Sequence, residues 1–231
     1  MPGKPLPEWE RVLSAAARLQ GILPGAVLVG GTAAAAHERH RLSVDADHVV
    51  ADLRERFDEV LAQLESVAGW KTARVRRPVL VLGSLDGIET GIRQLIRSAP
   101  LETETVSAPG GGSVVVPTRA EMLRIKAILI LKRNATRDYL DFAALARSLG
   151  ADGTADALGT LDELYPQENG ASPFQQLLVQ LASPMPFDLD GMDLTEYKRL
   201  APEWRDWGKV RAFCGELAAG LLRRGKGEGG G

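Results

Sequence analysis

Apolar and polar residues follow two different periods along this chain, and the pattern changes near Thr118. Before that point, helical spacing occurs in "PEWERVLSAAARLQG", in "TAAAAHER", where Thr32 would be the N-cap, and in "LRERFDEVLAQLESVAG", which Gly69 would close. Apolar or alternating runs predict strands in "AVLVGG", from Asp45 to Ala51, and in "TARVRRPVLVLG", "GIETGIRQLI", "ETETVSA" and "SVVVP", with "PGGGS" as a turn. After Thr118 every periodic segment is helical, including "PEWRDWGKVRAFCGELAAGLLRR".

Strands are thus confined to the first half of the chain, and the second half is all helical. This segregation predicts an α+β fold rather than an alternating parallel-sheet fold. We expect an α/β domain over residues 1–117, in which helices flank a mixed sheet, and a helical domain over residues 118–224. The glycine-rich end, residues 225–231, is expected to be a flexible tail.

The composition narrows the class of protein. With 231 residues, of which 45% are hydrophobic, the chain can form a sizeable core. A net charge of -2 excludes a strongly basic protein, so nucleic-acid binding would need a local basic patch. The single cysteine, Cys214, excludes an internal disulfide. No segment has the apolar core of a signal peptide or the roughly 18 apolar residues of a membrane span, so we expect a soluble cytoplasmic protein with no membrane partner.

Two aspartates, Asp45 and Asp47, are separated by one residue in a predicted strand. Their side chains would project from the same face, roughly 6–7 Å apart along the strand. Two such carboxylates repel each other unless a cation lies between them, and magnesium prefers oxygen ligands. The pair therefore indicates either a metal site or an edge strand whose charges face water.

A glycine pair, Gly30 and Gly31, ends an apolar strand just before a predicted helix. Such a turn allows the backbone to approach a phosphate at the positive end of the helix dipole, although Gly-Gly after a strand is also an ordinary turn. Because the two aspartates follow so closely in the chain, the combination favours a site that binds polyphosphate and metal together.

A lysine, Lys126, lies in the middle of the helix "EMLRIKAILILKR", which is apolar around most of its circumference and should be largely buried. The heptad spacing of Arg119, Lys126 and Arg133 places them on one stripe of this helix. Lys126 either extends its ammonium group into solvent along a buried stem or holds a phosphate whose charge offsets the cost of burial.

Two acids of the next helix, Asp138 and Asp141, are spaced to share one face. Without further chemistry, Asp141 could form a surface ion pair with Arg137, and Asp138 would simply suit the helix dipole. Alone, these residues indicate no function.

Together, these motifs resemble the AbiEii/AbiGii nucleotidyltransferase toxins, a group that includes the MenT-type toxins of mycobacteria. The resemblance covers roughly residues 25–148. It rests on "GGT", on "HRLSVDAD", on Pro117 leading into Lys126, and on Arg133 followed by "RDYLDFAAL", all in the same order as in the family.

The resemblance implies a DNA-polymerase-β-like nucleotidyltransferase domain followed by a helical domain, with the site in the cleft between them. The implied reaction moves a nucleoside monophosphate from a nucleoside triphosphate to an acceptor hydroxyl, which in MenT-type toxins is at the 3′ end of tRNA. It also implies a toxin of a toxin–antitoxin or phage-defence system, with a cognate antitoxin protein. By the same resemblance, Asp45 and Asp47 would bind magnesium or manganese and Lys126 and Asp141 would complete the catalytic set. The nucleotide-binding residues would be Gly30, Gly31, Thr32, Arg41, Ser43, Arg133 and Asp138.

One position departs from the family pattern. Polymerase-β-like enzymes often have a third carboxylate on a later strand, and "GIETGIRQLI" offers Glu89 followed by Gly91 where an aspartate would be more familiar. Either Glu89 supplies that carboxylate, or the chain works with Asp45, Asp47 and Asp141.

Several alternatives remain open at this stage. The acceptor could be a small molecule, as in antibiotic-modifying nucleotidyltransferases, or the chain could be a non-catalytic nucleotide- or partner-binding module on the same fold. A basic segment could be an RNA footprint or a solvated strand face (Lys71, Arg74, Arg76 and Arg77). A zinc site is a weaker alternative (His37, His40 and His48). The apolar stripe of the last helix indicates core packing, or else an antitoxin or self-association surface (Trp204, Trp207, Cys214, Leu217 and Leu221).

Overall fold

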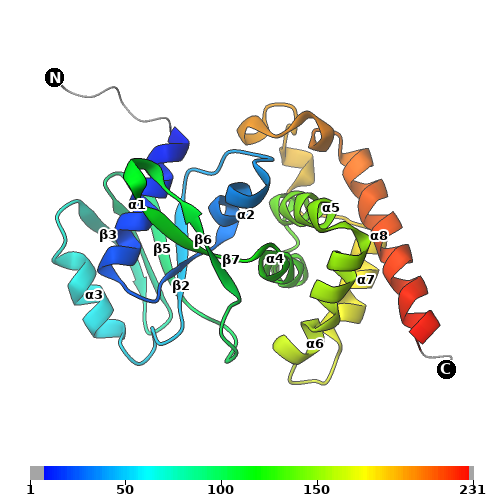
Figure 1. Cartoon of the computed structure of the whole chain (residues 1–231), viewed down its shortest axis with the longest axis horizontal. Coiled ribbons are helices and arrows are strands. Elements are labelled where there is room, and N and C mark those ends of the chain that lie inside the picture. The colour runs from blue at the N-terminus through cyan, green and yellow to red at the C-terminus, as the bar shows by residue number, and fades with distance from the viewer. Residues whose placement is uncertain (1–7, 229–231) are drawn as a thin grey trace. The chain divides into compact units, whose positions relative to one another are not determined.

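The computed structural model describes residues 8–228, with side chains up to residue 224. The chain forms two compact units. The first unit comprises the chain up to Ala36 together with Leu42–Thr118. The second unit comprises the short segment His37–Arg41 together with the chain from Arg119 onward. Figure 1 shows strands only in the first unit. The α+β class predicted from the sequence is therefore confirmed.

A five-stranded mixed sheet forms the centre of the first unit. Its strand order is β1-β2-β5-β4-β3. The strands span Val27–Leu28 (β1), Ala46–Val50 (β2), Trp70–Arg76 (β3), Leu80–Leu85 (β4) and Ile88–Gln94 (β5). β2 and β5 are parallel, and the other neighbours are antiparallel. The parallel register aligns Asp47 with Gly91.

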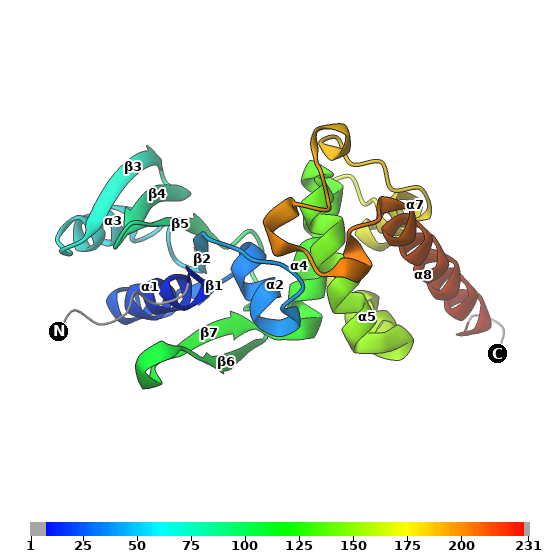
Figure 2. The ribbon, with the colours of Figure 1, turned by 90° about the horizontal axis from the view of Figure 1, so that it is seen from above.

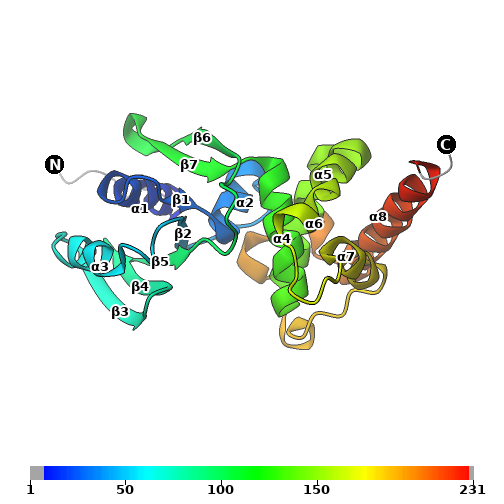
Figure 3. The same ribbon diagram turned by 90° about the horizontal axis from the view of Figure 1, so that it is seen from below.

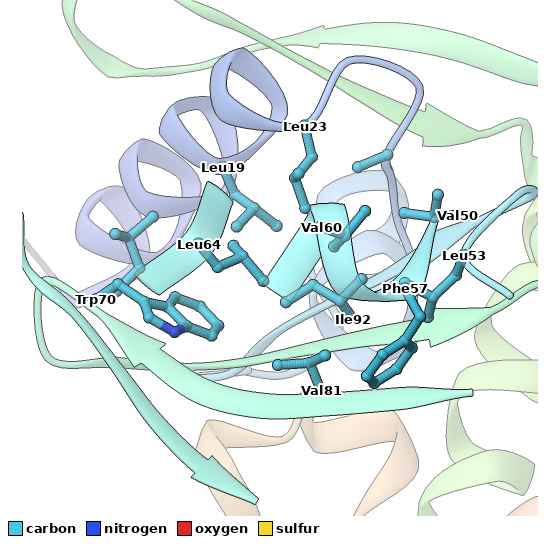
Figure 4. Packing of buried hydrophobic residues seen from close by; sticks show 12 residues of the cluster. Leu19, Leu23, Val50, Leu53, Phe57, Val60, Leu64, Trp70, Val81 and Ile92 are labelled. Atoms are coloured by element: carbon cyan, nitrogen blue, oxygen red, sulfur yellow. The ribbon is translucent and has the colours of Figure 1, made fainter. Parts of the chain in front are cut away.

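Two helices, α1 (Glu8–Ile22) and α3 (Phe57–Glu65), cover one face of this sheet. Figure 4 shows their side chains packed against those of the strands. Buried residues of both helices and of β2, β4 and β5 form this core, among them Leu19, Val50, Phe57, Val60, Leu64, Val81 and Ile92, and Leu23 just after α1 joins them. Since side chains alternate along a strand, the residues between these core positions point to the opposite face.

A separate two-stranded hairpin, β6 (Thr103–Ser107) and β7 (Ser113–Pro117), also belongs to the first unit. α1 contacts β7 as well as β2 and β5, and Figure 2 shows α1 lying between the hairpin and the larger sheet. The predicted turn contains the short helix η1 (Pro109–Gly111), in which Gly110 and Gly111 have φ values of 74° and 82° that favour glycine. The helix α2 (Gly30–Glu38) follows β1.

The second unit is helical. Its helices are α4 (Arg119–Arg133), α5 (Thr136–Gly159), α6 (Leu161–Leu164), α7 (Pro173–Ala182) and α8 (Trp207–Glu228), with short helices η2 (Leu189–Gly191), η3 (Tyr197–Arg199) and η4 (Pro202–Trp204) before α8. Figure 3 shows α4 beside α5 and α7 beside α8, and these pairs are in contact. Gly150 interrupts α5 with a φ of 71°. None of the helices within residues 8–228 is long and apolar enough to cross a membrane.

Several predicted boundaries were wrong for local physical reasons. Thr32 does not cap α2, which begins at Gly30, because its hydroxyl donates to the Asp45 carbonyl instead. α3 ends at Glu65 rather than at Gly69. "TARVRRPVLVLG" is two strands, since the proline after Arg77 offers no N–H to continue a strand ladder.

The C-terminal helix also differs from the prediction. Trp204 ends η4 and α8 begins at Trp207, where the Asp206 carboxylate accepts from the Gly208 amide at 2.8 Å and so caps the helix. α8 continues to Glu228, so the first part of the predicted tail is helical, and residues 229–231 lie outside the described residues.

Candidate active site

Two groups of predicted site residues are found, one within each unit. In the first, Asp45 lies just before β2 and Asp47 lies inside it. Both are partly exposed, whereas Ala46 and His48 beside them are fully buried. This alternation places both carboxylates on the sheet face opposite the helical core, as the spacing predicted.

Two hydroxyl groups hold Asp45 in place. Ser43 Oγ donates to Asp45 Oδ1 at 2.8 Å, and Thr32 Oγ1 donates to the Asp45 backbone carbonyl at 2.5 Å. Ser43 and Thr32 are each 1% exposed. Both hydroxyls were predicted to contact a triphosphate, and in the structure they position the first aspartate.

Glycines leave room around Asp47. A Cβ atom added to Gly91 would lie 2.3 Å from Asp47 Oδ1, and one added to Gly30 would lie 3.5 Å from Asp47 Cβ. The absence of a side chain at Gly91 therefore allows the Asp47 carboxylate to lie close to the backbone of β5. The guanidinium Nε of Arg93, on the same face of β5, lies 3.9 Å from Asp47 Oδ1, which sequence reasoning missed.

The glycine pair begins a helix next to these carboxylates. α2 starts at Gly30, whose φ is 75°, and the preceding Val29 amide donates to the Asp47 carbonyl at 2.8 Å. The first amides of a helix have no partners within it, so together with the helix dipole they form an anion-binding end. The first unit therefore places a helix N-terminus and two carboxylates side by side.

The donor set of this unit fits a divalent cation. Asp45 and Asp47 offer hard carboxylate oxygens on one partly exposed face, and the glycines keep the space beside Asp47 open. Mg²⁺ needs only one or two carboxylates when water and substrate phosphates supply its other ligands. Among residues 8–228 no group of three histidine, cysteine or acidic side chains is arranged to hold a metal. Glu89 is exposed on β5 and joins no such group.

The second unit gathers charged groups around Asp141, which is fully buried on α5. Its carboxylate lies 2.7 Å from the Lys126 ammonium and 2.7 Å from His40 Nε2, and it accepts from Arg41 Nε at 2.7 Å and Arg41 Nη2 at 2.9 Å. Burial alone would raise the pKa of Asp141, but Arg41, Lys126 and His40 together hold this pKa well below its usual range. Asp141 is therefore ionised, and Arg41 and Lys126 balance its charge.

Asp138 has a similar environment. Arg133 donates to it through Nε at 2.5 Å and Nη2 at 2.7 Å, and the Lys126 ammonium lies 3.5 Å away. Lys126 is 1% exposed, so its ammonium does not reach solvent. It lies between the two aspartates of α5 instead. Its predicted contact with phosphate oxygens stays a prediction.

The partners of Asp141 were not foreseen. Arg41 was predicted to bind nucleotide, and His40 was part of the family motif and of the zinc alternative, yet Arg41 forms an ion pair and His40 Nε2 a hydrogen bond with a residue about a hundred positions later. They lie in the short segment His37–Arg41 that belongs to the second unit. No local pattern in the sequence signals such a distant pairing.

Other candidates are less well supported. Burial raises the pKa of Cys214 to about 12, so its thiol is not an activated nucleophile. Cys214, Trp204 and Leu221 are buried, in agreement with core packing. The basic residues of β3 are exposed on an edge strand, and Arg77 stacks on Phe57 and pairs with Asp58. No three histidines come together within the described part of the chain.

Comparison with known proteins places these features in a family. The model of a family described as "Nucleotidyl transferase AbiEii toxin, Type IV TA system" matches residues 11–217. The chain therefore belongs to the AbiEii nucleotidyltransferase toxin family, as its motifs predicted.

Solved structures support the fold. "JHP933 from Helicobacter pylori" is 16% identical with a TM-score of 0.53, and the match covers 95% of this chain and 93% of that one. A "putative nucleotidyltransferase from H. pylori" is 15% identical with a TM-score of 0.52, and the match covers 94% of each chain. The structure thus has a nucleotidyltransferase fold, and the family makes the chain a transferase.

A curated relative is much longer than this chain. The "Mycolic acid-containing lipids exporter MmpL11" of Mycolicibacterium smegmatis is 34% identical over 137 residues, which are 56% of this chain but only 13% of that protein. This chain therefore resembles only a small part of that protein, and the name describes the whole of it.

Proposed function

We propose that this protein transfers a nucleoside monophosphate from a nucleoside triphosphate to an acceptor hydroxyl on RNA, at the 3′ end of tRNA, and acts as the toxin of a toxin–antitoxin or phage-defence pair. The observation that supports it best is the set of carboxylates and helix N-terminus in the first unit. Asp45 and Asp47 share one face of β2, and the N-terminus of α2 lies next to Asp47.

The proposed chemistry is in-line attack of the acceptor hydroxyl on the α-phosphorus. The new P–O bond forms as the bond to the β-phosphate breaks, pyrophosphate leaves, and the hydroxyl proton is lost to solvent or a base. Asp45 and Asp47 would hold magnesium or manganese, which supplies Lewis-acid activation of the hydroxyl and neutralises developing charge when bound.

The remaining residues bind and position. The first amides of α2, at Gly30 and Gly31, would hold the leaving phosphates. Ser43 and Thr32 fix Asp45 through the hydrogen bonds described above, so that its carboxylate is held in place before substrate binds. In the second unit, Lys126 and Arg133 are the residues proposed to bind phosphate, and Asp138 and Asp141 hold these cations in place.

The exposed basic strand supports an RNA acceptor. Lys71, Arg74 and Arg76 lie on the exposed edge strand β3. Cations on an exposed strand suit a phosphate backbone. Replacing Arg74 and Arg76 with alanine should weaken RNA binding and reduce its salt dependence, and unchanged binding and salt dependence would rule out this footprint.

The activity is tested with each α-labelled nucleoside triphosphate, total RNA and magnesium. We expect labelled RNA from the wild type and at least about a hundredfold less from Asp45→Asn, because a charge that stabilises the transition state is lost. Asp52→Asn is the matched control, since Asp52 is an exposed aspartate of the same unit that pairs with Arg56. Equal labelling by the wild type and Asp45→Asn would refute the assignment.

The same assay separates the acceptor classes. Label that appears only in small molecules would replace the RNA acceptor with a small-molecule acceptor. Growth arrest on expression, lost in Asp45→Asn and kept in Asp52→Asn, is the expected result for a toxin, and normal growth with the wild type would contradict that role.

A further inference from the structure

The face of the five-stranded sheet that bears Asp47 continues across the other strands. Register places Gly91 of β5 opposite Asp47 and Leu82 of β4 opposite Gly91. Contacts agree, since a Cβ atom added to Gly91 would lie 2.3 Å from Asp47 Oδ1 and 3.2 Å from Leu82 Cδ2. Ile92, the next residue of β5, lies in the core on the other face (Figure 4). Arg74 of β3 is opposite Leu82, so it projects from the same side as Asp47.

A second row on this face carries two more arginines. Arg93 of β5 is opposite Leu80 of β4, which is in turn opposite Arg76 of β3. The Arg93 side chain shares the face of Asp47, because its Nε lies 3.9 Å from Asp47 Oδ1. The three arginines are exposed, and we call them the arginine track (Arg74, Arg76 and Arg93).

Two members of the track differ from the next arginine along the chain in their charge balance. Arg77 pairs with Asp58 and lies 5.1 Å from the centre of the Phe57 ring, and both partners belong to α3 on the core side of the sheet. Among the side chains that the structure describes, none forms an ion pair or hydrogen bond with the guanidinium of Arg74 or Arg76. Positive charge is therefore uncompensated on the Asp47 side, where it attracts an anion.

The third member, Arg93, connects this charge to the candidate metal ligands. Along the parallel strands β2 and β5, acidic side chains come first, at Asp45, Asp47 and Glu89, and Arg93 follows. The side chains of Arg93 and Asp47 are 48% and 31% exposed. An ion pair at 3.9 Å between groups exposed to this extent contributes little, so Arg93 can bind an anion beside a metal ion on Asp47.

The dimensions of the track favour a chain of phosphates. β3 is three strands away from β2 in the sheet, and at about 4.8 Å per strand the two are roughly 14 Å apart. A nucleic-acid strand has one phosphate per about 3.4 Å of helix axis, so about four phosphates span this distance. The phosphate chain of one triphosphate is shorter. The track therefore fits an RNA backbone that crosses the strands.

We propose that the arginine track binds the phosphate backbone of a single-stranded RNA acceptor whose reacting end lies at Asp45 and Asp47, and that Arg93 binds the phosphate nearest that end. The proposal rests on the proposed function, which makes RNA the acceptor, and extends it by assigning Arg93 and the path of the RNA away from the site. Leucines rather than aromatic side chains lie between the arginines, so binding should not depend on base sequence.

Binding to the full chain tests the proposal without turnover. Fluorescent single-stranded oligoribonucleotides of two unrelated sequences are titrated at several KCl concentrations, without triphosphate or divalent metal. We expect Arg93→Gln to bind both about threefold to tenfold more weakly than the wild type. The slope of log Kd against log salt concentration should fall by about 0.7, the value for one phosphate contact on a single strand. Arg93→Lys keeps the charge and should retain the wild-type slope.

Arg77→Gln is the matched control, because Arg77 is next to Arg76 in the chain but is paired on the α3 side. It should change the affinity for RNA by less than about twofold and leave the slope unchanged. A second arm titrates each of the four nucleoside triphosphates with magnesium and without RNA. Arg93→Gln should bind them as the wild type does, and its thermal midpoint should be retained.

The outcomes separate this proposal from the proposed function. Unchanged RNA affinity and slope in Arg93→Gln would overturn the assignment of Arg93 even if the enzyme labels RNA. Equal losses in Arg93→Gln and Arg77→Gln would overturn the track, because positive charge on either side of the sheet would then suffice. Weaker binding of triphosphates alone would replace the RNA backbone with the triphosphate. Conversely, a reduced slope in Arg93→Gln would support the track even if the wild type transfers no nucleotide.

Discussion

Two pairs of aspartates in this molecule differ in how their charge is balanced. Asp45 and Asp47 are partly exposed, one is held by hydroxyl groups, and glycines keep space beside the other. Asp138 and Asp141 are fully buried, and three cations from the same unit lie against them. The first pair therefore lies on a partly exposed face where a ligand can reach it, whereas the second pair is surrounded by cations of its own unit. Similar spacing in the sequence thus has different physical consequences.

The largest expected effect on stability is at Lys126. Lys126→Met removes the cation between Asp138 and Asp141 while keeping the length of the side chain. Because buried carboxylates then lose part of their compensation, we expect the free energy of unfolding to fall by roughly 3–5 kcal/mol, measured by urea denaturation.

Lys132→Met is the matched control, because Lys132 is an exposed lysine of the same helix. It should change the free energy of unfolding by less than about 0.5 kcal/mol. Equal stability of both variants would mean that the cluster around Asp141 is not a stabilising one, and the contrast with Asp45 and Asp47 would fail.

Buried titratable groups of the two units should also make the free energy of unfolding fall in different pH ranges. His48 in β2 is fully buried, and desolvation lowers its pKa to about 4. The unfolded chain binds a proton at His48 near pH 6.5 and the folded chain does not, so stability falls as the pH falls from 6.5 to 4, by about 3 kcal/mol. Asp141 is a carboxylate whose pKa is lowered in the folded state. The stability that its ionised form contributes is therefore present at neutral pH and is lost only below about pH 4.

Urea denaturation at pH 7, 6, 5 and 4 measures this difference. His48→Asn keeps a donor for the Ala46 carbonyl, which His48 Nδ1 contacts at 3.0 Å, and removes the titrating ring. The variant should lose less stability than the wild type between pH 6.5 and pH 4. An identical pH dependence of the two proteins would show that another group causes the loss.

The sequence allowed the first pair to be predicted more fully than the second. The alternation around Asp45 and Asp47 and the burial of the helix that contains Lys126 follow from local periodicity, and the structure agrees with both. The partners of Asp141 could not be predicted, since His40 and Arg41 reach it only because a five-residue segment joins the second unit. Such pairing depends on the path of the chain and has no local pattern.

Gly91 is an intermediate case, and it yields the smallest predicted effect. In the sequence, Gly91 stands where the family pattern would more often have an aspartate. The structure gives a steric reason for a glycine at this position. A methyl group there would lie 2.3 Å from Asp47 Oδ1, so Gly91→Ala must displace that carboxylate. We expect nucleotide transfer to fall by about tenfold, equivalent to about 1.4 kcal/mol, because a small misplacement of a catalytic group costs rate. The free energy of unfolding should change by less than that amount, since the side chain of Asp47 is 31% exposed and can move toward solvent.

Gly21→Ala, at a helix position with nothing within 4 Å, is the control and should leave transfer unchanged. Full activity in Gly91→Ala would mean that the position of the Asp47 carboxylate is not critical, and the first pair of aspartates would then resemble the second in having a structural role.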